Sequence, residues 1–272
     1  MDYHLVQVEK KNLTLHSKLL SEVFKGTAKY SEDFLNWQYY QNPQGKVIGY
    51  DAFLGSDLVA HYVTIPVLYS FGNKLLKGLL SLNTATNKNH QGRGLFIKLA
   101  SATYELGRQE GYQFVIGVAN QNSTHGFIKK LGFNLLSKLQ VKIYMGELVH
   151  CGNNENQFRA FWNKDSAEWR LNNPRGKYFK SNGSVFSKTH LPFFNTLLTS
   201  NPVFGDSKLK KGGFNVLKMS IGLNTDVPSL AFNLPEFLKP SPLNLIFKDL
   251  STLGLIVSSE NCYFELIDFD AY

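Results

Sequence analysis

An apolar run that enters a glycine-rich turn is the feature that most constrains the fold of this chain. Residues 75–82 are mostly apolar, residues 84–94 (TATNKNHQGRG) are polar with two glycines one residue apart, and residues 95–100 become apolar again. This order indicates a strand, a tight turn and a helix whose first amides lack intrahelical partners. Such a turn suits a phosphate or pyrophosphate, although glycine also occurs there only to turn the chain.

The composition indicates a folded protein of one large or two ordinary domains. The chain has 272 residues, of which 43% are hydrophobic and 14% aromatic, so wholesale disorder is excluded. Cys151 and Cys262 are too few and too far apart for a disulfide framework or a metal cluster. The N-terminal residues do not form a signal peptide, and no apolar run approaches the ~20 residues of a membrane span. We therefore predict a soluble cytoplasmic protein without a bound metal.

The charge is positive but scattered. A formal charge of +8 and a pI near 9.3 suit an anionic ligand, a nucleic acid or an acidic membrane surface. The densest basic patches, at residues 10–11, 129–130 and 208–211, are short, and no zinc-finger or RNP-type aromatic motif accompanies them. We interpret these patches as solvated surface and disfavour a nucleic-acid partner.

Hydrophobic periodicity and turn residues predict a mixed α/β order within the first 146 residues. We expect strands at residues 3–8, 47–54, 59–71, 75–86, 114–119 and 133–144, and helices at residues 12–24, 31–40, 95–111 and 123–131. Three consecutive strands joined by short turns therefore lead into the glycine turn. This order indicates one domain with a mixed sheet.

The second half of the chain repeats a pattern of the first. Residues 33–38 and 42–46 (DFLNWQ and NPQGK) resemble residues 165–170 and 173–177 (DSAEWR and NPRGK). Agreement at these positions favours duplication over chance and a division into domains at residues 1–146 and 147–272. The second copy has no QGRG turn, since its nearest match, residues 210–214, leads into a predicted strand. That half is expected to serve as a lid, a docking wall or a brace.

Two motifs of the first half resemble those of the GNAT N-acetyltransferase superfamily. Residues 91–96 (QGRGLF) are similar to its (Arg/Gln)-x-x-Gly-x-(Gly/Ala) turn, and residues 127–133 (FIKKLGF) are similar to its second signature, which ends in Leu-Gly-Phe. The resemblance covers roughly residues 1–146. It implies an α/β (α+β) fold with a mixed, mostly antiparallel sheet flanked by helices, followed by a smaller, degenerate GNAT-like half.

The resemblance also implies acetyl-coenzyme A as the donor co-substrate. Backbone groups of residues 84–86 would pair with the pantetheine arm, and the amides of residues 91–96 would hold the pyrophosphate, with Arg93 adding a charged contact. Asn120, Asn122 and Ser123 would flank the thioester or the acyl-carrier arm. The coenzyme-binding residues so implied are Thr84, Ala85, Thr86, Gln91, Gly92, Arg93, Gly94, Leu95, Phe96, Asn120, Asn122 and Ser123.

Two departures from the family pattern affect the expected chemistry. Phe96 replaces the small residue that usually ends the turn, so its ring must find room. Ile128 stands where the family often has a tyrosine that protonates the departing thiolate. Thr124, His125 and Tyr104 are candidate substitutes, with solvent as a further alternative. His125 also has a simpler interpretation as a helix-surface residue.

Other residues have structural interpretations beside functional ones. His90 is expected to shape the turn or touch a phosphate. His61 is expected to be a satisfied core residue or to face the acceptor site. Trp37 and Trp169 are expected to be packing anchors of the repeated unit. The Tyr39-Tyr40 pair could stack on a substrate, with one of the two in the core.

These observations favour an N-acetyltransferase that acts on the primary amine of a small molecule, such as an amino sugar, a polyamine or an amino acid derivative. One alternative is a tandem-GNAT transferase that takes an aminoacyl group from transfer RNA, which the +8 charge and the repeat would suit. Another is an acyl-coenzyme A-binding module without catalysis, which Ile128 would suit. The sequence does not identify the acceptor substrate or the oligomeric state, so a homodimer remains an alternative.

Overall fold

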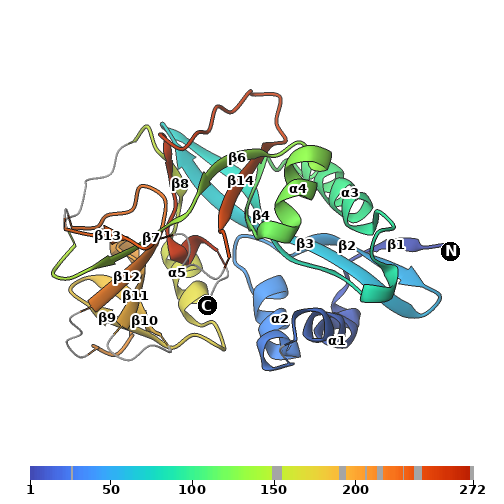
Figure 1. The fold of residues 1–272 in the computed structure, drawn as a ribbon, viewed down its shortest axis with the longest axis horizontal. Coiled ribbons are helices and arrows are strands. Elements are labelled where there is room, and N and C mark those ends of the chain that lie inside the picture. The colour runs from blue at the N-terminus through green and yellow to red at the C-terminus, as the bar shows by residue number, and fades with distance from the viewer. Residues whose placement is uncertain are drawn as a thin grey trace.

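Two β-sheets organise the computed structural model, which describes residues 1–25, 27–148, 155–189, 194–205, 207–212, 217–228, 230–235 and 241–269 (Figure 1). Within these ranges, sheet A has the strand order β1-β2-β3-β4-β5-β14-β6, with β8 paired to β3 and β15 paired to β8, and sheet B has the order β13-β7-β12-β11-β10-β9. The strands of sheet A are β1 (His4–Gln7), β2 (Ile48–Leu54), β3 (Asp57–Phe71), β4 (Lys74–Thr86), β5 (Phe114–Ala119), β6 (Asn134–Lys138), β8 (Phe158–Ala160), β14 (Asn244–Asp249) and β15 (Cys262–Tyr263). The strands of sheet B are β7 (Gln140–Tyr144), β9 (Tyr178–Ser181), β10 (Ser184–Lys188), β11 (Phe194–Thr199), β12 (Leu217–Gly222) and β13 (Phe232–Asn233).

Helices cover both faces of sheet A. Figure 1 shows α3 and α4 on one side of the sheet, and α1 and α2 on the other. Alternate residues of β3 accordingly enter different cores, because Tyr62 packs with residues of α3 and Val63 packs with residues of α1 and α2. The helices are α1 (Leu13–Phe24), α2 (Glu32–Tyr40), α3 (Leu95–Gln109), α4 (Gln121–His125) and α5 (Lys164–Leu171). The predicted fold class and the three-strand meander are confirmed.

The single strand predicted at residues 133–144 is wrong. The chain forms β6 in sheet A and then β7 in sheet B, with the buried Leu139 between them. The N–H of Leu139 donates to the carbonyl oxygen of Leu243 at 2.8 Å, just before β14 begins. A period-two pattern could not show this break because both strands continue the same alternation across it.

Each sheet contains strands from both halves of the chain. β7 from the first half lies between β12 and β13, and β14 from the second half lies between β5 and β6, with antiparallel pairing in all four cases. β4 pairs in parallel with β5, and β11 pairs in parallel with β12 at the equivalent place in sheet B. The predicted division at residue 146 follows the sequence repeat. Each sheet, however, contains strands from before and after this residue.

The repeated tryptophans meet face to face where the halves join. The rings of Trp37 on α2 and Trp169 on α5 stack with centroids 4.9 Å apart and an interplanar angle of 19°. Each indole N–H donates to the backbone carbonyl of the other tryptophan, at 3.0 and 3.2 Å. The predicted packing role of both residues is confirmed, and they pack on each other.

The described residues of the second half contain no counterpart of α3. Between β11 and β12, the described residues contain one 3-10 turn, Pro202–Phe204, in place of a long helix. Gly213 and Phe214, part of the nearest match to the glycine turn, lie outside the described residues, as does Cys151. Cys262 is buried, which raises the pKa of its thiol to about 12. None of the described helices has the length and apolarity needed to cross a membrane.

Replacement Trp169→Ala is expected to lower the free energy of unfolding by about 3 kcal/mol, because it removes the stacked ring and the hydrogen bond that its indole N–H donates to Trp37. Urea denaturation measures this loss. The matched variant Trp169→Phe keeps an aromatic surface but no N–H, so it should lose about 1 kcal/mol. An alanine variant as stable as the wild type would contradict a stabilising role for the stack.

Candidate active site

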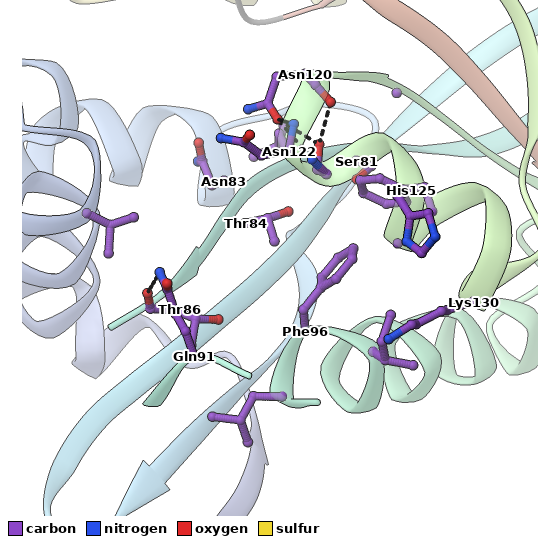
Figure 2. A pocket seen from close by; sticks show the side chains of 18 of the residues that line it. Ser81, Asn83, Thr84, Thr86, Gln91, Phe96, Asn120, Asn122, His125 and Lys130 are labelled. Atoms are coloured by element: carbon purple, nitrogen blue, oxygen red, sulfur yellow. Dashed lines mark hydrogen bonds between the residues drawn. The ribbon is translucent and has the colours of Figure 1, made fainter. Parts of the chain in front are cut away.

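A cleft opens where β4 and β5 separate. Their parallel pairing runs from Gly78 and Phe114 to Ser81 and Gly117, after which each strand continues without the other. Just beyond the last pair, Asn83 has a left-handed backbone with φ of +48°, and the pairing of β4 with β3 shifts register there. The resulting bulge turns the end of β4 away from β5. The cleft has a volume of about 760 Å³ (Figure 2).

The cleft contains most of the predicted coenzyme-binding residues. Eleven of those twelve residues line it, and the exception is Ala85, whose side chain points into the core beneath α1 and α2. Alternation along β4 explains this exception, and the predicted backbone role of Ala85 is independent of its side chain. The sequence did not single out several other wall residues, which come from α1, β4, the segment that enters β14 and the C-terminal segment. These include Val23, Phe24, Ser81, Asn83, Leu243, Ile246 and Phe269. Lys130, which the sequence placed in a solvated basic patch, also lines the cleft.

The glycine turn presents free amides to the cleft. Gly92 and Gly94 have φ of +74° and +73°, a conformation that other residues rarely adopt. Gly94 caps α3 without a side-chain hydrogen bond to the first turn of the helix, and that turn contains no acidic residue. The first N–H groups of α3 and the helix dipole therefore favour an anion. His90, which also lines the cleft, has its Nδ1 3.0 Å from the hydroxyl of Tyr3.

The charge of the cleft has one sign. Arg93 and Lys130 line it together with His90 and His125, and the described lining residues include no aspartate or glutamate. This distribution favours a ligand with negative charge. It also leaves the described wall without a carboxylate that could act as a general base.

The ring of Phe96 packs against Gly126, which has no side chain to obstruct it. Figure 2 shows this ring projecting from the start of α3 into the cleft, between Thr84 and His125. It packs edge-on against Phe127, with centroids 5.0 Å apart. A Cβ atom on Gly126 would lie 2.7 Å from Cε1 of Phe96, so the glycine compensates for the larger residue in the turn.

The three candidate acids occupy different places. His125 lines the cleft, whereas Thr124 is not part of the described lining. The hydroxyl of Thr124 donates to the carbonyl oxygen of Asn120 at 2.6 Å and accepts from Nδ2 of Asn244 at 2.8 Å. The third candidate, Tyr104, is buried outside the cleft, which raises the pKa of its hydroxyl well above the usual value.

Tyr104 nevertheless connects to the cleft through other hydroxyls. Its oxygen lies 2.5 Å from the hydroxyl oxygen of Tyr62, which lies 2.8 Å from Oγ of Ser81. Ser81 lines the cleft at the last β4–β5 pair, and Tyr104 also lines a separate hollow beside Lys130 and α3. Three hydroxyl groups thus form a continuous hydrogen-bonded path.

A second buried chain begins at Asn83. Nδ2 of Asn83 lies 2.9 Å from the hydroxyl of Tyr39, which lies 3.0 Å from Nε2 of His61. Asp51 then joins Nδ1 of His61 at 2.6 Å to Nε2 of His16 at 2.7 Å. His61 is therefore a satisfied core residue, and its expected alternative of facing the acceptor site is wrong. These nitrogen–oxygen distances are typical of hydrogen bonds, so a proton lies between the two atoms of each pair.

Replacement Gly126→Ala is expected to lower the free energy of unfolding by about 1–3 kcal/mol, because the new methyl group would collide with Phe96. The backbone of Gly126 is right-handed helical and accepts alanine without strain, so the collision alone decides the sign. Chemical denaturation of Gly126→Ala, Phe96→Ala and the double variant tests this. The double variant should lose less stability than the sum of the two single variants, and strict additivity would contradict the contact.

Comparisons with known proteins agree with this geometry. Residues 6–136 match a family model described as an acetyltransferase (GNAT) domain. A comparison with curated protein sequences found no significant match. Among solved structures, a probable N-acyltransferase from Enterococcus faecalis superposes with a TM-score of 0.63 at 8% identity, covering 92% of this chain and 73% of that one. GCN5-related N-acetyltransferases from Anabaena variabilis (TM-score 0.59, 10% identity, 92% and 73% covered) and Kribbella flavida (0.63, 11%, 92% and 72%) share the fold.

Proposed function

We propose that this protein, whose residues 6–136 match the GNAT acetyltransferase family model, transfers an acetyl group from acetyl-coenzyme A to a primary amine of a small molecule. The observation that carries the choice of donor is the glycine turn at the start of α3. Its free amides and Arg93 suit the pyrophosphate of coenzyme A. The edge of β4 at residues 84–86, which is not paired with β5, suits the amides of the pantetheine arm.

In the proposed reaction, the neutral amine attacks the thioester carbonyl carbon. The new N–C bond forms as the C–S bond breaks, the amine loses one proton, and the sulfur leaves as a thiolate that must be protonated. Holding the two reactants together in one cleft supplies much of the rate. Because the described wall contains no carboxylate, we propose that water removes the proton from the amine.

Ser81 is the proposed proton donor to the thiolate. Ile128 cannot donate a proton, whereas the hydroxyl of Ser81 lies where the strands separate and connects through Tyr62 to Tyr104. A proton that Ser81 gives to sulfur would be replaced from Tyr62, and Tyr62 would take its proton from Tyr104. Water in the separate hollow that Tyr104 lines would return the last proton. The buried tyrosines keep their protons at neutral pH, because burial raises the pKa of both hydroxyls.

The lining of the cleft also bears on the acceptor. A polyamine would find no acidic counter-charge among the described lining residues. Apolar side chains from α1, β14 and the C-terminal segment line the cleft instead, namely Val23, Phe24, Leu243, Ile246 and Phe269. An amino acid derivative or amino sugar with an apolar substituent therefore fits better than a polyamine.

A transferase that takes an aminoacyl group from transfer RNA is the second candidate. The double fold and the +8 charge favour it. Such a protein would bind RNA with an affinity that falls steeply as salt rises. Tight binding of acetyl-coenzyme A in the same cleft would count against it.

Isothermal titration calorimetry with acetyl-coenzyme A tests the donor. The wild type should bind, and Arg93→Ala should weaken the affinity about tenfold through loss of a charged contact to phosphate. Lys98→Ala removes an exposed cation of α3 outside the described lining of the cleft, so it is the matched control and should bind like the wild type. A folded wild type that binds no acetyl-coenzyme A at millimolar concentration would exclude this donor.

Release of free thiol with a panel of primary amines tests the proton path. Tyr104→Phe should lower kcat on the order of 100-fold, because it interrupts the path that resupplies the proton of Ser81, and leave the Kd of acetyl-coenzyme A unchanged. Tyr112→Phe, which removes a half-buried hydroxyl elsewhere, is the control. If His125→Ala abolishes turnover and Tyr104→Phe does not, His125 is the donor. Binding without thiol release from any amine would instead indicate a non-catalytic module.

A further inference from the structure

A buried carboxylate fixes the direction of every hydrogen bond that leads to Asn83. Burial opposes the charge of Asp51, but hydrogen bonds from His16 and His61 hold its pKa below the usual value. An ionised carboxylate only accepts, so Nε2 of His16 and Nδ1 of His61 both donate to it. Burial lowers the pKa of His61 despite the nearby carboxylate, so this ring is neutral and its Nε2 carries a lone pair.

The same direction continues to the cleft. Tyr39 is fully buried and keeps its proton, because burial raises its pKa, so its hydroxyl donates to Nε2 of His61 at 3.0 Å. The oxygen of Tyr39 must then accept from Nδ2 of Asn83 at 2.9 Å. The second N–H of that amide donates to Oε1 of Gln38 at 2.7 Å.

Both N–H groups of the Asn83 side chain are therefore occupied. Its carbonyl oxygen, Oδ1, has no hydrogen-bond partner among the residues that the structure describes. The residue is partly exposed and lines the cleft at the bulge of β4 (Figure 2). It precedes the stretch 84–86 proposed for pantetheine, so it lies on the side of that stretch away from the glycine turn, where the acyl group would lie.

We propose that Oδ1 of Asn83 accepts an N–H of the acceptor amine, and that the chain Tyr39–His61–Asp51 is a positioning device that locks the amide in this orientation. The inference rests on the proposed function. A fixed acceptor at this point selects a nucleophile that carries N–H and holds it while its lone pair faces the thioester carbon. A primary amine gives up one proton in the reaction and keeps one N–H in the amide product, so this contact can persist from substrate to product.

The backbone of Asn83 determines the best variant. Its φ of +48° disfavours alanine, whereas glycine adopts this conformation without strain. Asn83→Gly therefore removes the side chain and leaves the bulge. Tyr39→Phe removes the hydroxyl that orients the amide. Tyr69→Phe is its matched control, because Tyr69 is equally buried, does not line the cleft, and its hydroxyl has no hydrogen-bond partner within the described structure.

Two coenzyme A conjugates make the test independent of the acceptor's identity. In one, the sulfur carries CH2–CO–NH–CH3, which reproduces the product N–H. In the other it carries the methyl ester CH2–CO–O–CH3, which has the same shape without N–H. Calorimetry should give the wild type a roughly 5- to 10-fold preference for the amide, and Asn83→Gly a ratio near one. Tyr39→Phe should give an intermediate ratio, and Tyr69→Phe that of the wild type.

The outcomes separate this inference from the proposed function. Equal affinity of the wild type for the two conjugates, with coenzyme A itself bound, would overturn the role of Asn83 and leave the donor site intact. Weaker binding of unmodified coenzyme A by Asn83→Gly, to the same degree as the conjugates, would place Asn83 against the pantetheine arm and also overturn the inference. A wild type that binds neither coenzyme A nor the conjugates would overturn both proposals.

Discussion

The separation of β4 from β5 is the feature on which the candidate site depends. Two parallel strands normally satisfy each other's backbone groups along their shared length. Here the pairing ends at Ser81 and Gly117, and the bulge at Asn83 carries the end of β4 away. The edge of β4 beyond Ser81 is therefore available to a ligand, although β4 lies inside the sheet. The same separation brings the glycine turn to one end of the cleft and the β5–α4 connection to its side.

The second half of the chain completes this cleft by contributing β14 to sheet A. β14 supplies the sheet neighbour that β5 would otherwise lack on its outer side. Ile246 of β14 and Leu243, just before it, lie in the cleft wall. The stacked tryptophans join the two repeats at a separate point. The loss of a helix equivalent to α3 explains why the second repeat offers no matching anion site among the described residues. Of the expected roles for this half, its geometry best fits that of a wall of the cleft.

The buried chain behind Asn83 is costly to maintain. A fully buried carboxylate is tolerated only when hydrogen bonds compensate for its lost hydration, and here two histidines provide them. Apolar residues could fill the same volume without this requirement. The hydrogen bonds continue from His61 through Tyr39 to the side chain of Asn83 at the cleft. A positioning role explains this link to the cleft, and a purely structural role does not.

The sequence by itself determined the local elements of the first half and the residues of the glycine turn. These features were predictable because each depends only on residues close together in the sequence. They are the apolar periodicity, the spacing of Gly92 and Gly94, and the two family motifs. The tertiary structure alone decided that β6 and β7 belong to different sheets, that Gly126 makes room for Phe96, and that His61 is buried behind Asn83. It also decided that Val23 and Phe269, from opposite ends of the chain, line the same cleft. These contacts join residues that are distant in sequence or unremarkable alone, and they exist only because packing and strand pairing bring them together.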